Sequence, residues 1–156
     1  WDAGVAHGIA DYGSFAMNVM RMEKGFKGAG ELTNEVTLAE ADVLRFARAD
    51  KAYLGRDKTL NTNLPCVCAY LEIEPDGIAD GHGGEAVLHK GQVVGSTASV
   101  AYGPTVGKIL AFAYIKPAAA VPDTSLEVII HGKLRPARVL AEPAYDPQSL
   151  KPRTDA

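Results

Sequence analysis

The chain has 156 residues, of which 47% are hydrophobic, and its formal net charge at pH 7 is −3. This length suits one globular domain or a small domain with a neighbouring fragment. The acidic balance argues against a nucleic-acid or anionic-membrane partner, and no apolar run reaches the roughly 18 residues of a membrane span. The chain opens at Trp1 in what reads like the middle of a domain, so we expect a fragment of a longer polypeptide.

The first element expected along the chain is a helix over residues 13–25. Apolar side chains recur there at 4, 3 and 4 residue spacing, as they do on one face of an amphipathic helix. Ser14 is the expected N-cap and Gly25 the C-terminal stop. The expected apolar stripe consists of Phe15, Val19, Met22 and Phe26.

Two shorter elements are expected before the composition changes. Apolar and charged side chains alternate over residues 43–49, VLRFARA, which is typical of a half-buried strand. A short helix is expected over residues 52–60. The change in composition falls at residues 60–63, and we therefore divide the chain into an N-terminal part, 1–62, and a C-terminal part, 63–156.

The C-terminal part consists of strand-like runs separated by Gly, Pro, Asp and Asn. Six such runs predict an antiparallel β-barrel or a jelly-roll-like sandwich. Hairpin turns are expected at residues 89–92, HKGQ, and 131–134, HGKL, because each has a glycine for unusual backbone angles. The polar tail from Pro143 should lie extended over the surface. The runs are LPCVCAYLEIE, EAVLHKG, QVVGSTASVAYG, KILAFAYIK, SLEVIIHG and KLRPARVLAE.

Alternating Val and Ile suit a pleated, half-buried surface and supply much of the expected barrel core. Cys66 and Cys68 stand two apart in one expected strand, so both should point to one face, where a disulfide between them would be strained. We expect both to be buried thiols in a reducing compartment. The expected core residues are Val93, Val94, Ile109, Leu110, Phe112, Leu126, Val128 and Ile130.

The polar constellations of the C-terminal part favour structural interpretations. The four histidines are scattered, with no pair at ligand spacing on one helix, so no metal site is expected. Asp80 and His82 share a glycine-rich loop that we expect to be solvated. Tyr102 and Tyr114 are interpreted as core tyrosines, with packing of the barrel against the N-terminal part as the alternative.

Arg21 is the candidate functional residue of the N-terminal part. It lies away from the apolar stripe and has Met17 and Met20 nearby, and a guanidinium beside apolar surface needs a partner because an unpaired charge there is costly. Two interpretations stay open from the residues alone. Arg21 pairs with a carboxylate of its own chain, for instance Glu23 or Glu40, or it serves a ligand site.

Several segments of the chain carry longer patterns. MRMEKGFKGAGELTNEVTLAEAD contains R-x-E-x-G followed by T-x-x-E-A, and VVGSTASVAYGPTVGKILAFAYI forms one long patterned barrel segment. Together with DKAYLGRDKTL and PAYDP, and in order over residues 4–147, they resemble the folate-binding aminomethyltransferase family, which has the glycine-cleavage T-protein fold. The closer resemblance is to the C-terminal half of dimethylglycine and sarcosine dehydrogenases.

The resemblance implies the fold and the site. Residues 1–62 would be the C-terminal part of the folate-binding domain, and 63–156 the C-terminal β-barrel domain with its tail, which gives an α+β fragment followed by an all-β antiparallel barrel. Arg21 would line the tetrahydrofolate cavity. The family's catalytic aspartate and pterin-binding glutamate lie upstream, so no catalytic residue is assigned here. The family usually has an aromatic residue where this chain has Ala29, and GAGEL is one residue shorter than usual.

The function that the resemblance implies is that of the C-terminal tetrahydrofolate-binding part of a flavin-dependent N-methyl-amine dehydrogenase or oxidase. An upstream FAD domain would oxidise an amine such as dimethylglycine or sarcosine, and folate held nearby would take up the one-carbon unit. This chain alone should be inactive. The alternatives are a stand-alone aminomethyltransferase and a non-catalytic folate-binding module. The expected partners are the amine, folate and the upstream part of the polypeptide, in the bacterial cytoplasm or the mitochondrial matrix.

Overall fold

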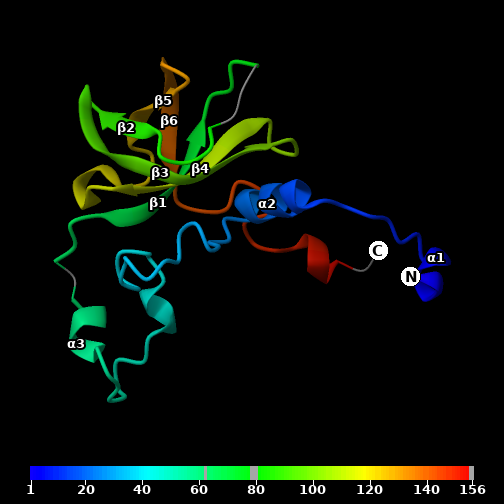
Figure 1. The fold of residues 1–156 in the computed structure, drawn as a ribbon, viewed down its shortest axis with the longest axis horizontal. Helices are drawn as coiled ribbons and strands as arrows, with labels where there is room; N and C mark the ends of the chain where they lie inside the picture. The colour runs from blue at the N-terminus through cyan, green and yellow to red at the C-terminus, as the bar shows by residue number, and fades with distance from the viewer. Residues whose placement is uncertain (62, 78–80, 155–156) are drawn as a thin grey trace.

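The central feature of the computed structural model, which describes residues 1–61, 63–77 and 81–154, is a closed six-stranded antiparallel β-barrel (Figure 1). Around the barrel the strands follow the order β1-β4-β3-β2-β5-β6, and closure removes the exposed sheet edges. The expectation of an antiparallel barrel is confirmed, and each strand lies within one of the predicted runs. The strands are β1 (Val67–Ile73), β2 (Ala86–His89), β3 (Gln92–Gly103), β4 (Lys108–Ile115), β5 (Ser125–Ile130) and β6 (Lys133–Leu140).

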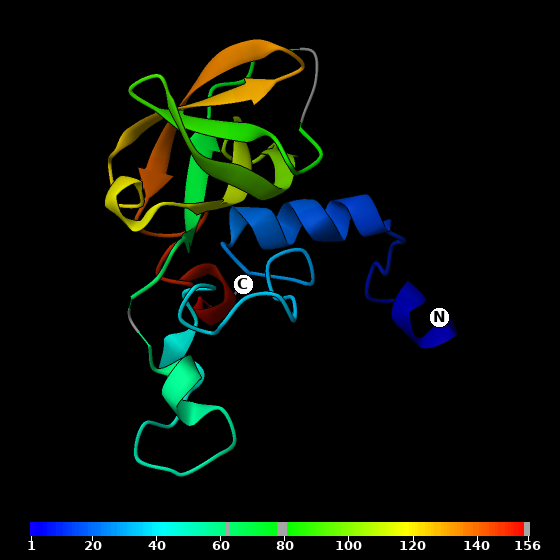
Figure 2. The same cartoon turned by 60° about the vertical axis from the view of Figure 1, so that its left-hand side comes forward.

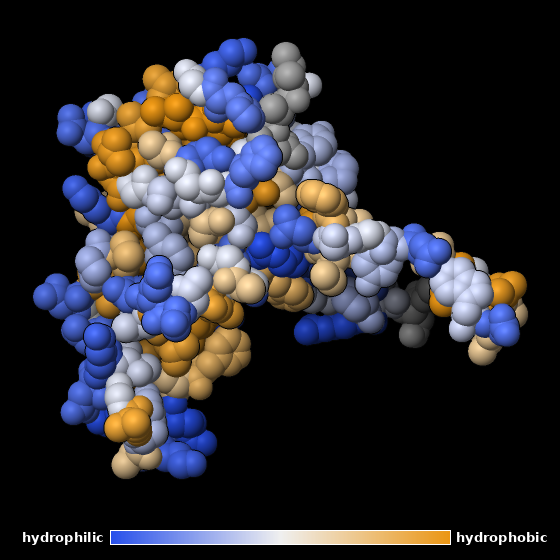
Figure 3. Space-filling model, viewed as in Figure 1, coloured by the Kyte–Doolittle hydropathy of each residue, from blue (hydrophilic) through white to orange (hydrophobic). Residues whose placement is uncertain are grey.

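One helix, α2, lies against the outside of the barrel, whereas α1 and α3 stand away from it on extended arms (Figures 1 and 2). Figure 3 shows apolar surface on the N-terminal arm, where Trp1 is 67% exposed. None of the helices in the described residues is long and apolar enough to cross a bilayer. The helices are α1 (Asp2–Val5), α2 (Ser14–Glu23) and α3 (Arg56–Thr59), with 3₁₀ helices at Leu44–Phe46, Pro117–Ala119 and Lys151–Arg153.

The core has two layers that share β4. Its sequence, KILAFAYI, is almost continuously apolar, and the strand is buried on both faces. Ile109 and Ile115 point into the barrel, where they join the interior cluster. Leu110 and Phe112 point outward and pack with Met22 of α2 in a second cluster. The two faces of β4 thereby join the barrel to the N-terminal part.

The expected core residues are buried with two differences. Val94 is only partly buried, and Val93 is 60% exposed, so its assignment to the core is wrong. The pairing of β2 with β3 changes register between Val87 and Leu88, next to this position. A bulge of this kind shifts the alternation of inward and outward side chains, which explains why Val93 faces solvent.

Both expected hairpin turns are confirmed. Lys90 and Gly91 have φ angles of 51° and 73°, and His131 and Gly132 have φ angles of 49° and 76°. Two successive residues with positive φ form the two-residue turn that matches the twist of the flanking strands. The glycine in each turn adopts this conformation without steric cost.

The helix expected over residues 13–25 is confirmed as α2, although Gly13 occupies the N-cap position that Ser14 was expected to hold. Gly25 ends the helix region with a φ of 66°. The expected apolar stripe is wrong at both ends, because Phe15 is 88% exposed and Phe26 is 62% exposed. The first turn of α2 extends past the barrel (Figure 2), and the chain reverses at Gly25 before it reaches Phe26.

The strand expected over residues 43–49 is wrong, and the helix expected over 52–60 is reduced to α3. Asp42 has a φ of 53°, and the backbone N–H of Val43 donates to the carbonyl of Leu38, so this stretch satisfies its backbone groups through local turns. It pairs with no strand in the described part of the chain. Gly55, with a φ of 81°, precedes α3 and excludes a longer helix.

The substitution Gly95→Ala tests the closure of the barrel. A Cβ at Gly95 would lie 1.9 Å from the carbonyl oxygen of Tyr114 on the paired strand, so the backbones of β3 and β4 would have to separate. We expect the free energy of unfolding to fall by roughly 1–3 kcal/mol or more, measured by urea denaturation. Ser96→Ala, at the next and exposed position, is the control and should change it by less than about 0.5 kcal/mol. Equal effects of the two substitutions would contradict this prediction.

Candidate functional site

Arg21 lies in the last turn of α2, and its guanidinium is held by four hydrogen bonds. Nε donates to Asn18 Oδ1 at 2.9 Å, and Nη1 donates to the Phe26 carbonyl at 3.1 Å. Nη1 also forms an ion pair with Glu31 Oε2 at 2.9 Å, and Nη2 donates to Ser99 Oγ on β3 at 3.0 Å. The side chain is 22% exposed. One guanidinium therefore joins α2, the loop after it and the barrel.

The own-chain carboxylate anticipated for Arg21 exists, but it is Glu31, and neither Glu23 nor Glu40 pairs with it. A guanidinium has five N–H donors, and the four bonds leave one N–H of Nη2 without a partner among the described residues. The Arg21 side chain is also partly exposed. It can therefore donate a hydrogen bond to a ligand while it keeps the ion pair with Glu31. The two interpretations of Arg21 are therefore compatible with each other.

Glu31 is the residue of this site that the sequence reasoning missed. Its side chain is fully buried, Oε2 also accepts from the Gly28 N–H at 2.7 Å, and Oε1 is buried without a hydrogen-bond partner in the described residues. The flanking glycines were the available signal. A Cβ at Gly28 would lie 3.3 Å from Arg21 Cζ, and one at Gly30 would lie 2.6 Å from Ser99 Oγ. An added Cβ at Gly30 would therefore displace Ser99 Oγ, the atom that accepts from Arg21, and one at Gly28 would be tight against the guanidinium.

The other residues of the R-x-E-x-G and T-x-x-E-A patterns form hydrogen bonds and packing contacts with neighbouring segments of the chain. Glu23 is buried, and its Oε1 accepts from the Thr105 N–H in the turn between β3 and β4 at 2.8 Å. Glu40 Oε2 accepts from the Thr37 N–H and hydroxyl at 2.7 and 2.8 Å. These bonds, the backbone one foremost, lower the pKa of the Glu40 carboxyl. Gly25 packs against Pro143, where an added Cβ would lie 3.4 Å from the ring.

The tail after β6 returns to the end of α2. The Tyr145 N–H donates to the Glu23 carbonyl at 3.0 Å, and Lys24 Nζ donates to the Asp146 carbonyl at 2.6 Å. Lys24 also forms an ion pair with the Asp146 carboxylate at 3.5 Å. The tail lies on the surface as expected, but the expectation that it is extended is wrong at Asp146 and Ser149, which have φ angles of 44° and 52°, and at Lys151–Arg153, which form a 3₁₀ helix. The start of the tail forms one wall of a groove.

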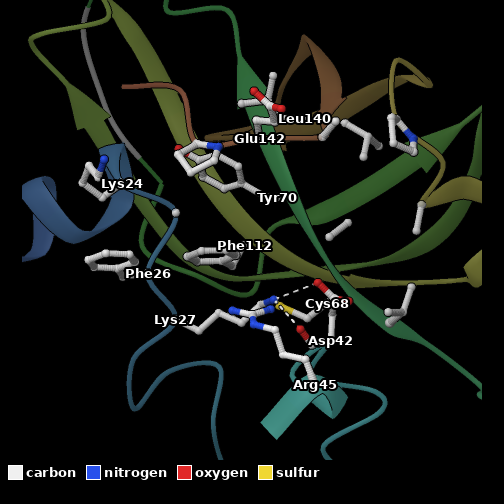
Figure 4. Close-up of a pocket in the computed structure, with 18 residues that line it drawn as sticks. Lys24, Phe26, Lys27, Asp42, Arg45, Cys68, Tyr70, Phe112, Leu140 and Glu142 are labelled. Carbon is white, nitrogen blue, oxygen red and sulfur yellow. Dashed lines mark hydrogen bonds and ion pairs between the residues drawn. The ribbon is translucent and has the colours of Figure 1, made fainter. Parts of the chain in front are cut away.

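This groove, with a volume of about 420 Å³, lies between the exit of α2, β1, β4 and the start of the tail (Figure 4). Its floor includes Cys68, Tyr70 and Phe112, and Tyr70 uses its hydroxyl to donate to the Met22 carbonyl at 2.6 Å. Arg21 is not among the residues that line it. The chain therefore offers two separate candidate sites, the Arg21 cluster and the groove.

Charged side chains surround the mouth of the groove. Lys27 Nζ pairs with Asp42 Oδ2 at 3.1 Å and lies 5.8 Å from the centre of the Phe112 ring. The Arg45 guanidinium lies 4.6 Å from the centre of the Phe46 ring. In Figure 4 the side chains of Lys27, Asp42 and Arg45 converge below Phe112.

Cys66 and Cys68 are both free, as expected, with Cys66 half-buried and Cys68 buried. Burial raises the pKa of the Cys68 thiol to about 12 and also raises that of Cys66. A thiol with so high a pKa is protonated at neutral pH and is a poor nucleophile. Cys68 therefore acts as part of the apolar floor of the groove.

The remaining candidates contribute no further site. The described residues contain no group of three or more His, Cys, Asp or Glu side chains that could hold a metal ion. Asp80 lies outside the described residues, and His82 is exposed, with its ring 6.2 Å from that of His131. Ala29 is exposed on the loop after α2. Tyr114 does join the two parts, because its hydroxyl donates to the Glu31 carbonyl at 2.6 Å.

The substitution Glu31→Gln tests the ion pair. The amide keeps the size of the side chain but removes the charge that Arg21 meets, so we expect the free energy of unfolding to fall by roughly 1–3 kcal/mol in urea denaturation. Glu35→Gln, on the exposed part of the same loop, is the matched control and should change it by less than about 0.5 kcal/mol. Equal stability of Glu31→Gln and the unchanged chain would show that the pair does not hold the loop.

Comparison with known proteins relates the chain to dimethylglycine dehydrogenases and aminomethyltransferases. The chain is 34% identical to "Dimethylglycine dehydrogenase, mitochondrial" of Mus musculus, over 90% of this chain and 17% of that protein. It is 30% identical to "Probable aminomethyltransferase" of Thermococcus kodakarensis, over 94% of this chain and 40% of that protein. The chain thus spans less than half the length of either relative.

The fold is similar to that of glycine cleavage system aminomethyltransferase T from Bartonella henselae, with a TM-score of 0.75 over 85% of this chain and 38% of that chain. At 19% identity this likeness shows the fold alone. Residues 67–146, which include all six strands, match the family described as the glycine cleavage T-protein C-terminal barrel domain. Because the match covers half of the chain and the whole barrel, the chain belongs to the glycine cleavage T-protein C-terminal barrel domain family.

Proposed function

We propose that this chain is the C-terminal tetrahydrofolate-binding part of a flavin-dependent N-methyl-amine dehydrogenase or oxidase. The observation that carries the proposal is the Arg21 guanidinium, which is fixed by four hydrogen bonds and keeps one N–H for a ligand. The identity with a dimethylglycine dehydrogenase along nearly the whole chain supports the flavoenzyme branch. Residues 1–62 are proposed to complete a folate domain and 63–156 to form the barrel domain.

The residues around Arg21 fit tetrahydrofolate. Folate combines a polar pterin and an anionic glutamyl tail with an apolar linker, so its site needs a fixed donor among apolar side chains. Met17 and Met20, which flank Arg21 on α2, are 56% and 49% exposed and offer adaptable apolar surface. Ala29 offers no aromatic wall, which we expect to weaken binding by about 1 kcal/mol or more relative to an aromatic side chain.

Each partner would have a separate task in the longer polypeptide. Bound tetrahydrofolate would supply the amine that accepts the one-carbon unit, and Arg21 would orient it, so that capture becomes a local reaction. FAD would belong to the preceding part, and no residue of this chain is assigned to it. The two free thiols support a reducing compartment, either the bacterial cytoplasm or the mitochondrial matrix.

A stand-alone aminomethyltransferase is the second candidate, supported by the identity with the Thermococcus protein. The length of the polypeptide before Trp1 separates the candidates. The aligned segment is 40% of the transferase and 17% of the dehydrogenase, so roughly 200 preceding residues favour the transferase and several hundred more favour the flavoenzyme. The third candidate is a folate-binding module without catalysis, supported by the departure at Ala29. It requires that no acidic residue occupy the catalytic position of the preceding part.

The substitution Arg21→Ala should weaken tetrahydrofolate binding by roughly 1.5–3 kcal/mol, because one charge-assisted hydrogen bond is lost. Calorimetric titration of the longer polypeptide measures this loss. Oxidation of the amine at the flavin should be largely unaffected, because that step belongs to another domain.

Because Arg21 also holds Glu31, folding needs its own control. Arg21→Lys keeps the charge but cannot reproduce the planar fork, so it should retain part of the folate affinity. Circular dichroism and thermal melting of both variants identify any loss of structure. Unchanged folate affinity in a folded Arg21→Ala variant would overturn the assignment of Arg21.

The flavoenzyme assignment has a direct test of its own. The longer polypeptide should have a flavin absorption spectrum and should oxidise an N-methyl amine in a reaction that tetrahydrofolate stimulates. A polypeptide that binds folate through Arg21 but has no flavin domain would retain the folate site and exclude the dehydrogenase.

A further inference from the structure

A β-bulge in β3 changes the side of the barrel to which Ser99 points. Thr97 pairs with Ala113 of β4, which belongs to the interior cluster. Ser99 pairs with Phe112 of β4, which belongs to the second cluster, outside the barrel. Directly paired residues lie on the same face of a sheet, and in a regular strand residues 97 and 99 would also share one face. Ala98 is the extra residue of the bulge, so Thr97 faces inward and Ser99 faces outward.

The outward direction of Ser99 brings its hydroxyl to the Arg21 guanidinium. Arg21 Nη2 donates to Ser99 Oγ at 3.0 Å. The other two nitrogens, Nε and Nη1, are bonded to Asn18 and Glu31. Since a guanidinium is planar, bonds at all three nitrogens fix the direction of the second Nη2 N–H, which has no partner among the described residues. A Ser99 side chain that pointed into the barrel would leave Nη2 without its acceptor on β3.

The segment before β2 holds the bulge through Glu85 and Thr97. The Gly84 N–H donates to the Thr97 carbonyl at 2.7 Å, and the Thr97 N–H donates to the Glu85 carbonyl at 2.9 Å. The Glu85 N–H donates to Thr97 Oγ1 at 3.0 Å, and this hydroxyl in turn donates to the Glu85 carboxylate. A bulge disrupts the regular ladder of a sheet, and these bonds satisfy the backbone groups of Thr97 beside it. We call this set of bonds the Glu85–Thr97 clasp.

Gly83 lets this segment approach the bulge closely. Its φ of 102° is one that glycine adopts without steric cost, and an added Cβ would lie 2.5 Å from the Ala98 carbonyl oxygen. The Gly83 N–H donates to Glu85 Oε2 at 3.0 Å, and the His82 N–H donates to Glu85 Oε1 at 2.6 Å. The carboxylate of the clasp is therefore itself held by two backbone N–H groups.

We propose that the bulge at Ala98 and the Glu85–Thr97 clasp position Ser99 so that it fixes the guanidinium of Arg21. Glu85 and Thr97 are positioning residues, because they act on Arg21 through Ser99. The fixed guanidinium presents its second Nη2 N–H in one direction, which lowers the cost of ordering it when a ligand binds. The consequence for tetrahydrofolate rests on the proposed function, whereas the effect on the guanidinium does not.

Rotation of the Arg21 Nη2 group tests the proposal without a ligand. The rotation exchanges the two Nη2 protons and requires the bond to Ser99 to break, and NMR of the chain with isotope-labelled arginine measures its rate. In Ser99→Ala and in Thr97→Val we expect rotation at least about fivefold faster than in the unchanged chain, the factor that one ordinary hydrogen bond is worth. Thr97→Val leaves Arg21 and Ser99 in place, so faster rotation in this variant reports the position of Ser99 and not the loss of its hydroxyl.

A second measurement separates this proposal from the folate assignment of Arg21. In the longer polypeptide, Thr97→Val should weaken tetrahydrofolate binding at least about threefold, because the guanidinium is less well fixed before the ligand binds. Faster rotation together with unchanged folate affinity would retain the positioning of Arg21 by Ser99 and would contradict the proposed folate contact.

Ser96→Ala is the matched control, because Ser96 is exposed on the same strand and lies before the clasp. Rotation in this variant should stay within about twofold of the rate in the unchanged chain. A dispersed amide spectrum identifies the variants that keep the barrel. Glu85→Gln, which leaves the interior side chain of Thr97 unchanged, tests the clasp if Thr97→Val does not fold. Unchanged rotation in folded Thr97→Val or Glu85→Gln, or equal acceleration by Ser96→Ala, would overturn the proposal.

Discussion

The ion pair between Arg21 and Glu31 is the interaction on which the arrangement of the N-terminal part depends. Glu31 is fully buried, and a buried carboxylate is tolerated only when a cation or several donors meet it. Arg21 provides the cation and at the same time bonds Asn18 on its own helix and Ser99 on the barrel. This ion pair holds the loop that contains Gly28 and Gly30 close to α2 and to β3.

Two tyrosines of the barrel complete the attachment. The hydroxyl of Tyr114 donates to the Glu31 carbonyl, and that of Tyr70 donates to the Met22 carbonyl, so β4 and β1 each hold one segment of the N-terminal part. Arg21 and Ser99 are 78 positions apart in the sequence, and the barrel brings them within hydrogen-bond distance. A ligand at Arg21 would therefore contact a side chain whose position is fixed by the helix, the loop and the barrel together.

The strands and turns of the barrel could be predicted because their signals are local: apolar alternation, and glycine at the positions with positive φ. The register shift between β2 and β3 exposes Val93, and the position of α2 against the barrel leaves Phe15 exposed. Both effects depend on neighbouring elements, so no local pattern in the sequence reveals them. Residues 43–49 have the pattern of a strand but no partner strand among the described residues. Arg21 was identified through its need for a partner and through the family resemblance, whereas Glu31 is brought to it by the fold of the loop.

We propose that Arg21 holds Glu31 and binds folate simultaneously. A crystal structure of the longer polypeptide with tetrahydrofolate bound tests this most directly. We expect Nη1 to keep its ion pair with Glu31 and the free N–H of Nη2 to donate to the ligand at about 2.7–3.2 Å. Tetrahydrofolate bound elsewhere, with no atom of Arg21 within hydrogen-bond distance of it, would show that Arg21 is not part of the folate site.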